Sequence, residues 1–281
     1  MAGETRPWRH AWRIGLVLGL PLLAAAQWPP IDHHAPVDQV RDLAGPVQLR
    51  LAPVAGFRFV TRIVVRKGQV RDRIRFEGRG RSEALGDQLR WHLRLERIVD
   101  GDNVTQGAPL IDVEMVTNTA GESLGTNANL RNLPRNQDEG SPGLDARWLG
   151  RQWLQTIKYR PFALPKGPVA AGDPFISLGA YLGAAFARVE GLELTEPLAP
   201  SRLDGMADLH GRRVLAGHLD DAFSVQHPRG HGRIHAAGYA LVDVETGLML
   251  DALVHFTGNL TLASGPTLRV DYEIHSQISF E

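Results

Sequence analysis

A long period-two alternation of apolar and polar side chains constrains this chain more than any other feature. Between Phe57 and Val99 nearly every second residue is apolar, with many arginines between, and the pattern returns from Arg212 to Phe280. Successive side chains of an extended chain point to opposite faces, so this pattern predicts β-strands with one buried and one wet face. The clearest example sets Leu89, Trp91, Leu93 and Leu95 against Arg90, His92, Arg94 and Glu96.

The middle of the chain has a different period. Residues Asp145–Lys158 and Asp173–Glu190 place apolar side chains at steps of three and four, which predicts two helices joined by a proline-stiffened connector. Four strands are expected after them, over Val214–Gln226, Gly232–Val244, Leu248–Leu260 and Leu268–Phe280. The expected fold class is mainly β (α+β). It is a single curved antiparallel sheet or open half-barrel wrapping a short central helical insertion, at about residues 143–190.

The first 26 residues have the pattern of a cleaved signal peptide. Three arginines precede the short apolar run Ile14–Leu23, and Ala24-Ala25-Ala26 follows it. The run is shorter than the roughly 20 apolar residues of a membrane-spanning helix. We therefore expect a signal peptide over residues 1–26, a mobile Pro/His-rich lead-in over 27–46 and a single β-rich domain over 47–281.

Charge and cysteine content limit the partners and the cellular location. The chain has 31 basic and 31 acidic residues, so no overall charge attracts it to nucleic acid. It has no cysteine, so neither a disulfide nor a lipidated N-terminal cysteine is available. We expect a periplasmic or secreted protein that is soluble and does not span the membrane after cleavage.

The segment Asp243–Gly247, of sequence DVETG, lies between two alternating runs. Asp243 can accept hydrogen bonds from amides further along the chain, Thr246 is a turn residue, and Gly247 can adopt positive φ. An aspartic protease motif needs Asp directly before Thr-Gly, where this chain has Glu245. The segment therefore predicts a structural hairpin turn.

Ser123 lies in Gly121-Glu122-Ser123-Leu124-Gly125, which matches the G-x-S-x-G elbow of serine hydrolases. The elbow works where a strand leads into a tight turn and a helix follows, and residues 126–134 are poor helix formers. A catalytic Ser123 is therefore the less favoured interpretation.

His227, His231 and His235 form the densest histidine cluster. Pro228, Gly230 and Gly232 disfavour the helix that would align them, and no cysteine or paired carboxylate nearby completes a zinc site. We expect a solvated turn, no metal site and no cofactor.

Residues 58–81 contain nine basic residues against Asp72 and Glu77. If the segment is extended, many of its arginines share one face, which is either a solvated sheet face or an anion-binding surface for lipid head groups or acidic glycans. The residues of this candidate surface are Arg58, Arg62, Arg66, Arg71, Arg73 and Arg75.

The segment LPKGPVAAGDPF, followed downstream by GYALVDVETGLML, resembles uncharacterised exported bacterial β-proteins. These are similar in plan to periplasmic lipoprotein-carrier and lipid-binding folds, and the resemblance covers roughly residues 150–280. It implies a curved antiparallel sheet over helices with an apolar cleft, and it supplies no catalytic residues.

The function predicted from the sequence is therefore non-enzymatic. We expect an exported soluble protein that binds an apolar or amphipathic, lipid-like molecule or an envelope component in a cleft between sheet and helices. Two alternatives stay open: an outer-membrane β-barrel, for which long alternating strands speak, and a serine hydrolase that uses Ser123.

Overall fold

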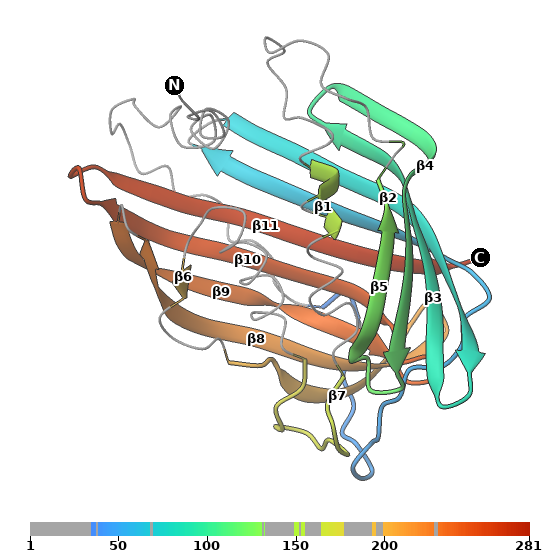
Figure 1. Ribbon diagram of the computed structural model, residues 1–281. Coiled ribbons are helices and arrows are strands. Elements are labelled where there is room, and N and C mark those ends of the chain that lie inside the picture. Colours follow the sequence, from blue (N-terminus) through green and yellow to red (C-terminus); the bar gives the residue numbers. More distant parts are fainter. Residues whose placement is uncertain are drawn as a thin grey trace.

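A computed structural model describes residues 35–37, 39–67, 70–130, 132, 149–151, 153–154, 164–176, 193–194, 199–227 and 230–281. Eleven strands form one sheet in this part of the chain (Figure 1). They are β1 (Phe57–Lys67), β2 (Val70–Leu85), β3 (Gln88–Asp100), β4 (Asn103–Asn118), β5 (Ser123–Asn129), β6 (Glu193–Leu194), β7 (Arg202–Leu209), β8 (Arg212–His227), β9 (Gly230–Asp243), β10 (Met249–Leu262) and β11 (Thr267–Phe280).

The sheet consists of two antiparallel meanders joined by the first and last strands. Its order is β5-β4-β3-β2-β1-β11-β10-β9-β8-β6, and β7 pairs with β8 as well. The β1–β11 pairing runs from Phe57 opposite Phe280 to Val65 opposite Tyr272. Figure 1 shows the sheet curving along this order. The prediction of a mainly β protein with one curved, open antiparallel sheet is confirmed.

The predicted helical insertion is not confirmed. Residues 149–151 and 153–154 are helical, within the first expected helix. Residues 164–176 contain bends, a turn and isolated bridges instead of a helix, and they include the first four residues of the second expected helix. The remainder of that helix, residues 177–190, lies outside the described residues. Among the described residues no helix is long and apolar enough to cross a lipid bilayer.

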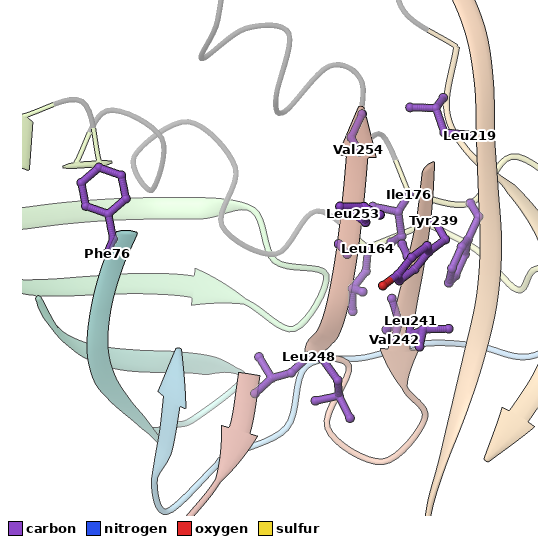
Figure 2. Packing of buried hydrophobic residues seen from close by; sticks show 14 of the residues in the cluster. Phe76, Leu164, Ile176, Leu219, Tyr239, Leu241, Val242, Leu248, Leu253 and Val254 are labelled. Carbon is purple, nitrogen blue, oxygen red and sulfur yellow. The ribbon is translucent and has the colours of Figure 1, made fainter. Parts of the chain in front are cut away.

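Most strands turn their apolar side chains mainly to one side of the sheet, which we call the inner face, whereas β9 and β10 bury side chains on both sides along much of their length. In β3, Leu89, Trp91, Leu93 and Leu95 are at most 3 % exposed and alternate with more accessible polar residues. The inner sides of β8, β9 and β10 contribute Leu215, Phe223, Ile234 and Phe256 to the same core. Figure 2 shows part of this core, with side chains of β9 and β10 and with Leu164 and Ile176 from the segment between the meanders.

The short helical segment lies on the inner face at β1 and β2. The Trp153 ring stacks on the Phe59 ring, with centroids 5.6 Å apart and planes 16° apart. A Cβ at Gly78 would lie 2.4 Å from the Phe59 ring, so the absence of a side chain there lets this ring lie against β2. Leu149 and Leu154 beside Trp153 are buried as well. Glycine in β2 therefore makes room for an aromatic stack that fixes the segment to the sheet.

Two extended segments, residues 47–54 and 164–170, join the two meanders at one end of the inner face. We call them the closing segments. The Leu51 amide donates to the carbonyl of Thr119 after β4 at 2.8 Å, and the Ala52 amide donates to that of Thr246 after β9 at 3.0 Å. Val47 and Val169 exchange backbone hydrogen bonds of 2.8 and 2.9 Å. No such backbone link joins the meanders at the other end within the described residues.

Candidate functional site

Apart from Phe280 near the end of β11, five inward-facing apolar side chains of β1 and β11 are only half-buried, although they lie at the centre of the sheet. We call this set the apolar strip; its members are Phe59, Ile63, Tyr272, Ile274 and Ile278. By contrast, the inward side chains named above for β3, β8, β9 and β10 are at most 3 % exposed. Fully burying a side chain of this size is worth about 1.5–3 kcal/mol. The strip is therefore apolar surface, and a ligand that covers it would bind with a favourable free energy.

One polar pair interrupts the apolar strip. Thr61 and Ser276 are directly opposed in the β1–β11 pairing, between the Phe59–Ile278 and Ile63–Ile274 pairs. Their hydroxyl oxygens lie 3.1 Å apart and are part-buried. A hydroxyl can both donate and accept, so this pair can also bind a polar group of a ligand. Apolar surface with a few placed polar groups is typical of small-molecule sites.

The opposite, outer face carries a buried polar cluster at β1, β10 and β11. We call it the Arg66 network. Arg66 donates to Asp271 at 3.1 Å and to Glu273 at 2.5 Å, and His255 Nε2 lies 2.8 Å from the same Asp271 oxygen. The same nitrogen of His255 lies 3.2 Å from Nη1 of Arg66, so the three side chains contact one another. The side chains of Arg66, His255 and Asp271 are 12 %, 9 % and 8 % exposed. Burial by itself would lower the pKa of the Arg66 guanidinium, but hydrogen bonds to Glu273 and Asp271 outweigh it and raise that pKa.

A second buried carboxylate, Asp251 of β10, lies on the outer face as well. Its Oδ1 accepts from the Tyr239 hydroxyl at 3.0 Å and from His275 Nε2 at 2.8 Å, and its Oδ2 accepts from Gln277 at 3.0 Å. Donors on β9 and β11 thus converge on a carboxylate of the strand between them. His–Asp pairs can serve in acid–base catalysis, but this cluster and the Arg66 network are largely shielded from solvent, which favours a structural role.

Neither of these two buried carboxylates, Asp271 and Asp251, is predicted by the sequence patterns described above. The sequence does contain a feature that points to a buried polar site: Asp251 and His255 are polar residues four apart in the otherwise apolar run of β10. In a strand, residues four apart share a face. Their partners come from other strands, however, and only the strand order brings these together.

The six arginines of the predicted anion-binding surface lie on β1 and β2. Directly opposed pairs are Arg58–Arg79, Arg62–Arg75 and Arg66–Arg71, and Arg73 is opposite Val64. Register therefore places all six on the outer side. Arg66 is buried in its network, and the Arg71 side chain lies outside the described residues. Arg62 and Arg73 are exposed and have no ion-pair partner within the described part of the chain.

Asp243, Thr246 and Gly247 form the turn between β9 and β10. Arg212 donates to both Asp243 oxygens, at 3.0 and 2.9 Å, and the amide and hydroxyl of Thr246 donate to Oδ2 at 2.9 and 2.6 Å. Gly247 has φ 69°. Burial alone would raise the pKa of Asp243, but these hydrogen bonds outweigh it and lower that pKa. With no exposed surface and four donors bound, this carboxylate holds the turn together.

Ser123 is the first residue of β5 and is exposed. Its hydroxyl lies 3.3 Å from that of Thr126, and a strand, not a helix, follows it. The strand–turn–helix geometry that a nucleophilic elbow requires is therefore missing.

The three clustered histidines lie in the β8–β9 hairpin. His231 and His235 are both exposed on β9, and four residues along a strand separate Cα atoms by about 13 Å. His235 pairs with Asp220 at 2.5 Å, and the His227 side chain lies outside the described residues. No group of three or more His, Asp or Glu side chains in the described part of the chain is placed to hold a metal ion.

No protein-family model and no curated protein matches the sequence. Solved structures that are similar to it include the following three. One is a domain assigned as an outer-membrane lipoprotein-sorting protein from Vibrio parahaemolyticus, at 10 % identity and TM-score 0.22, covering 81 % of this chain and 86 % of that one. Another is a DUF1329 family protein from Desulfovibrio piger, at 7 % identity and TM-score 0.23, with coverage of 81 % and 86 %.

The third similar structure is the MucA/MucB complex of Pseudomonas aeruginosa, at 16 % identity and TM-score 0.19. The match covers 79 % of this chain but only 51 % of that one. TM-scores of this size are far below the level that indicates a shared fold, so these likenesses assign no function to this chain.

Proposed function

We propose that this protein is an exported, non-enzymatic binding protein whose inner face takes up an apolar or amphipathic, lipid-like molecule. The observation that carries the proposal is the apolar strip, in which Phe59, Ile63 and Ile274 are half-buried at the centre of an otherwise well-covered apolar face. The Thr61–Ser276 hydroxyl pair within the strip gives an amphipathic ligand a polar contact. Of the apolar ligands, those with one polar group therefore fit best.

The test uses cis-parinaric acid, a fluorescent fatty acid, titrated into the purified protein. Ile63→Ser removes apolar surface from the strip and is expected to weaken binding about tenfold, since about 1.4 kcal/mol corresponds to a factor of ten. Val64→Ser is the matched control, because Val64 is the next residue of β1 and faces the outer side. The control should bind the acid as the unchanged protein does.

Two results would contradict the proposal. One is the absence of saturable binding of the probe by the unchanged protein. The other is an equal loss of affinity in Ile63→Ser and Val64→Ser at equal thermal stability, which would place the probe elsewhere.

Thr61→Val separates the polar from the apolar part of the site. The change keeps the shape of the side chain and removes the hydroxyl that lies 3.1 Å from Ser276. We expect weaker binding of parinaric acid and unchanged binding of its methyl ester. If both probes weaken equally, the hydroxyl pair does not contact the head group.

Export is the second part of the proposal, and its support is the basic start, short apolar run and Ala24-Ala25-Ala26 of the sequence. N-terminal sequencing of protein released from the periplasm or the medium should begin at Gln27 or within a few residues. Intact Met1 on protein recovered from the cytoplasm would contradict it.

A further inference from the structure

Arginines of three neighbouring strands form one continuous surface on the outer side of the sheet. We call it the arginine face; its members are Arg58, Arg62, Arg73, Arg75, Arg79, Arg81 and Arg94. Arg79 of β2 lies directly between Arg58 of β1 and Arg94 of β3. Like charges directly opposed across strands destabilise a sheet. A sheet face that only contacts solvent does not require directly opposed pairs of arginines.

The acidic groups within this face leave its arginines accessible. Arg58 pairs with Glu281, Arg79 with Glu96 and Glu281, Arg94 with Asp112, and Arg75 with Glu77. The four arginine side chains of these pairs are 38–60 % exposed. Ion pairs between exposed side chains contribute little to stability, so a competing anion can replace them.

Three members of the face have no ion-pair partner among the described residues: Arg62, Arg73 and Arg81, all exposed. Arg62 lies opposite Arg75, and Arg81 lies opposite His92 of β3. Guanidinium groups bind phosphate oxygens through paired donors, so exposed arginines without an ion-pair partner are suited to phosphate-bearing surfaces.

Valines lie among these arginines on the same outer side. Val60 and Val64 of β1 are half-buried, Val99 lies opposite Arg75, and Val104, opposite Val99, is 49 % exposed. Basic and aliphatic side chains together are typical of surfaces that rest on a lipid interface, where apolar groups contact the acyl boundary and cations contact head groups.

We propose that the arginine face docks the protein on an anionic phospholipid membrane surface. The choice of a membrane over a soluble polyanion rests in part on the proposed function, because a carrier of a poorly soluble lipid-like molecule must meet the membrane that supplies or receives it. Near such a surface each basic residue strengthens binding about fivefold. The attraction weakens with salt, since the screening length falls from about 8 Å at 0.15 M to about 3 Å at 1 M.

The test is co-sedimentation of the full chain with vesicles of phosphatidylcholine alone or mixed with phosphatidylglycerol. The triple variant Arg62→Gln, Arg73→Gln, Arg81→Gln should lose affinity for anionic vesicles by a factor on the order of one hundred, from about fivefold per residue. The matched control is Arg202→Gln, Arg213→Gln, Arg233→Gln, which removes the same charge from exposed positions in β7, β8 and β9. We expect the control to bind anionic vesicles as the unchanged protein does, and neither protein to bind neutral vesicles.

Three results would overturn the proposal: no binding of the unchanged protein to anionic vesicles, an equal loss in the two triple variants, or tighter binding to dextran sulfate than to vesicles. The last would identify a soluble polyanion as the partner. Parinaric acid binding, measured on the same variants, should not change. Failure of docking and failure of the proposed ligand site can therefore be distinguished.

Discussion

Arg62 and Arg66 share one face of β1 but have opposite surroundings. Arg66 is 12 % exposed and bonded to Asp271 and Glu273 of β11, whereas Arg62 is exposed and has no ion-pair partner among the described residues. Beside Arg62 in β11 lies His275, which is already bonded to Asp251. The outer side of the sheet thus has a region that satisfies its own charges and a region that leaves them available.

This contrast separates structural charge from charge that can serve a partner. A buried ion pair adds little over apolar packing while both partners are present, but removal of one partner leaves an uncompensated charge. Exposed charges contribute little to stability in either case. Stability measurements on single variants can therefore distinguish the buried, paired charges of the outer face from its exposed, unpaired charges.

Arg66→Gln should have the largest effect. It leaves the carboxylates of Asp271 and Glu273 without their guanidinium partner in a site with little solvent, and we expect the free energy of unfolding to fall by about 3–5 kcal/mol. Urea unfolding followed by circular dichroism measures it. A loss no larger than that of Arg62→Gln would remove the distinction between the two regions.

Asp243→Asn tests the buried carboxylate of the β9–β10 turn. It weakens the hydrogen bonds from Arg212 and Thr246 in the β9–β10 turn, and hydrogen bonds to charged groups are worth about 1.5–3 kcal/mol, so a loss of about 2–3 kcal/mol is expected near pH 7.

The pH dependence of this loss has a definite sign. The pKa of Asp243 is lower in the folded protein, so its ionised form contributes full stability above the unfolded-state pKa of about 3.9. That contribution is lost as the pH falls through the folded-state pKa. The stability difference between the unchanged protein and Asp243→Asn should therefore narrow below about pH 4, and a constant difference down to pH 2 would contradict this cause.

Gly247→Val should cost about 1–3 kcal/mol through backbone strain. Gly247 has φ 69°, and a Cβ there would lie 2.6 Å from the carbonyl oxygen of Arg50 in a closing segment. Glu245→Gln in the same turn is the control, because Glu245 is 68 % exposed, and it should stay within about 0.5 kcal/mol of neutral. Thermal melts of both variants measure this, and the reverse ordering would make Glu245 the functional group of the turn.

Arg62→Gln should have the smallest effect on stability, within about 0.5 kcal/mol of neutral. The variant removes an exposed charge next to Arg75, which lies directly opposite on β2. Its melting temperature should equal that of the unchanged protein. A loss above 1 kcal/mol would mean that Arg62 has a structural partner.

Sequence patterns located most of the strands and their faces. Alternation predicted β3 and β8–β11 to within a few residues of their bounds. Apart from the two-residue β6, two strands were missed. In β7 the buried positions alternate, but two of them are the small residues Gly205 and Ala207, so the apolar pattern is weak. Strand β5 is rich in Gly, Ser, Thr and Asn, and its side chains are mostly exposed. Both lie at or next to an edge of the sheet, where burial imposes the weakest pattern.

By itself, the sequence determined the local properties of this protein: extended segments, the side of each that is apolar, and the bend at Asp243–Gly247. Those follow from side-chain alternation and backbone preference within a few residues. Only the tertiary structure decided that β1 pairs with β11, that Arg66 is enclosed by residues about two hundred positions away, and that Arg62 is not. Arg62 and Arg66 occupy equivalent places in the alternating pattern of β1. The neighbouring strand alone sets their different surroundings, because pairing between distant segments depends on the packing of the whole core.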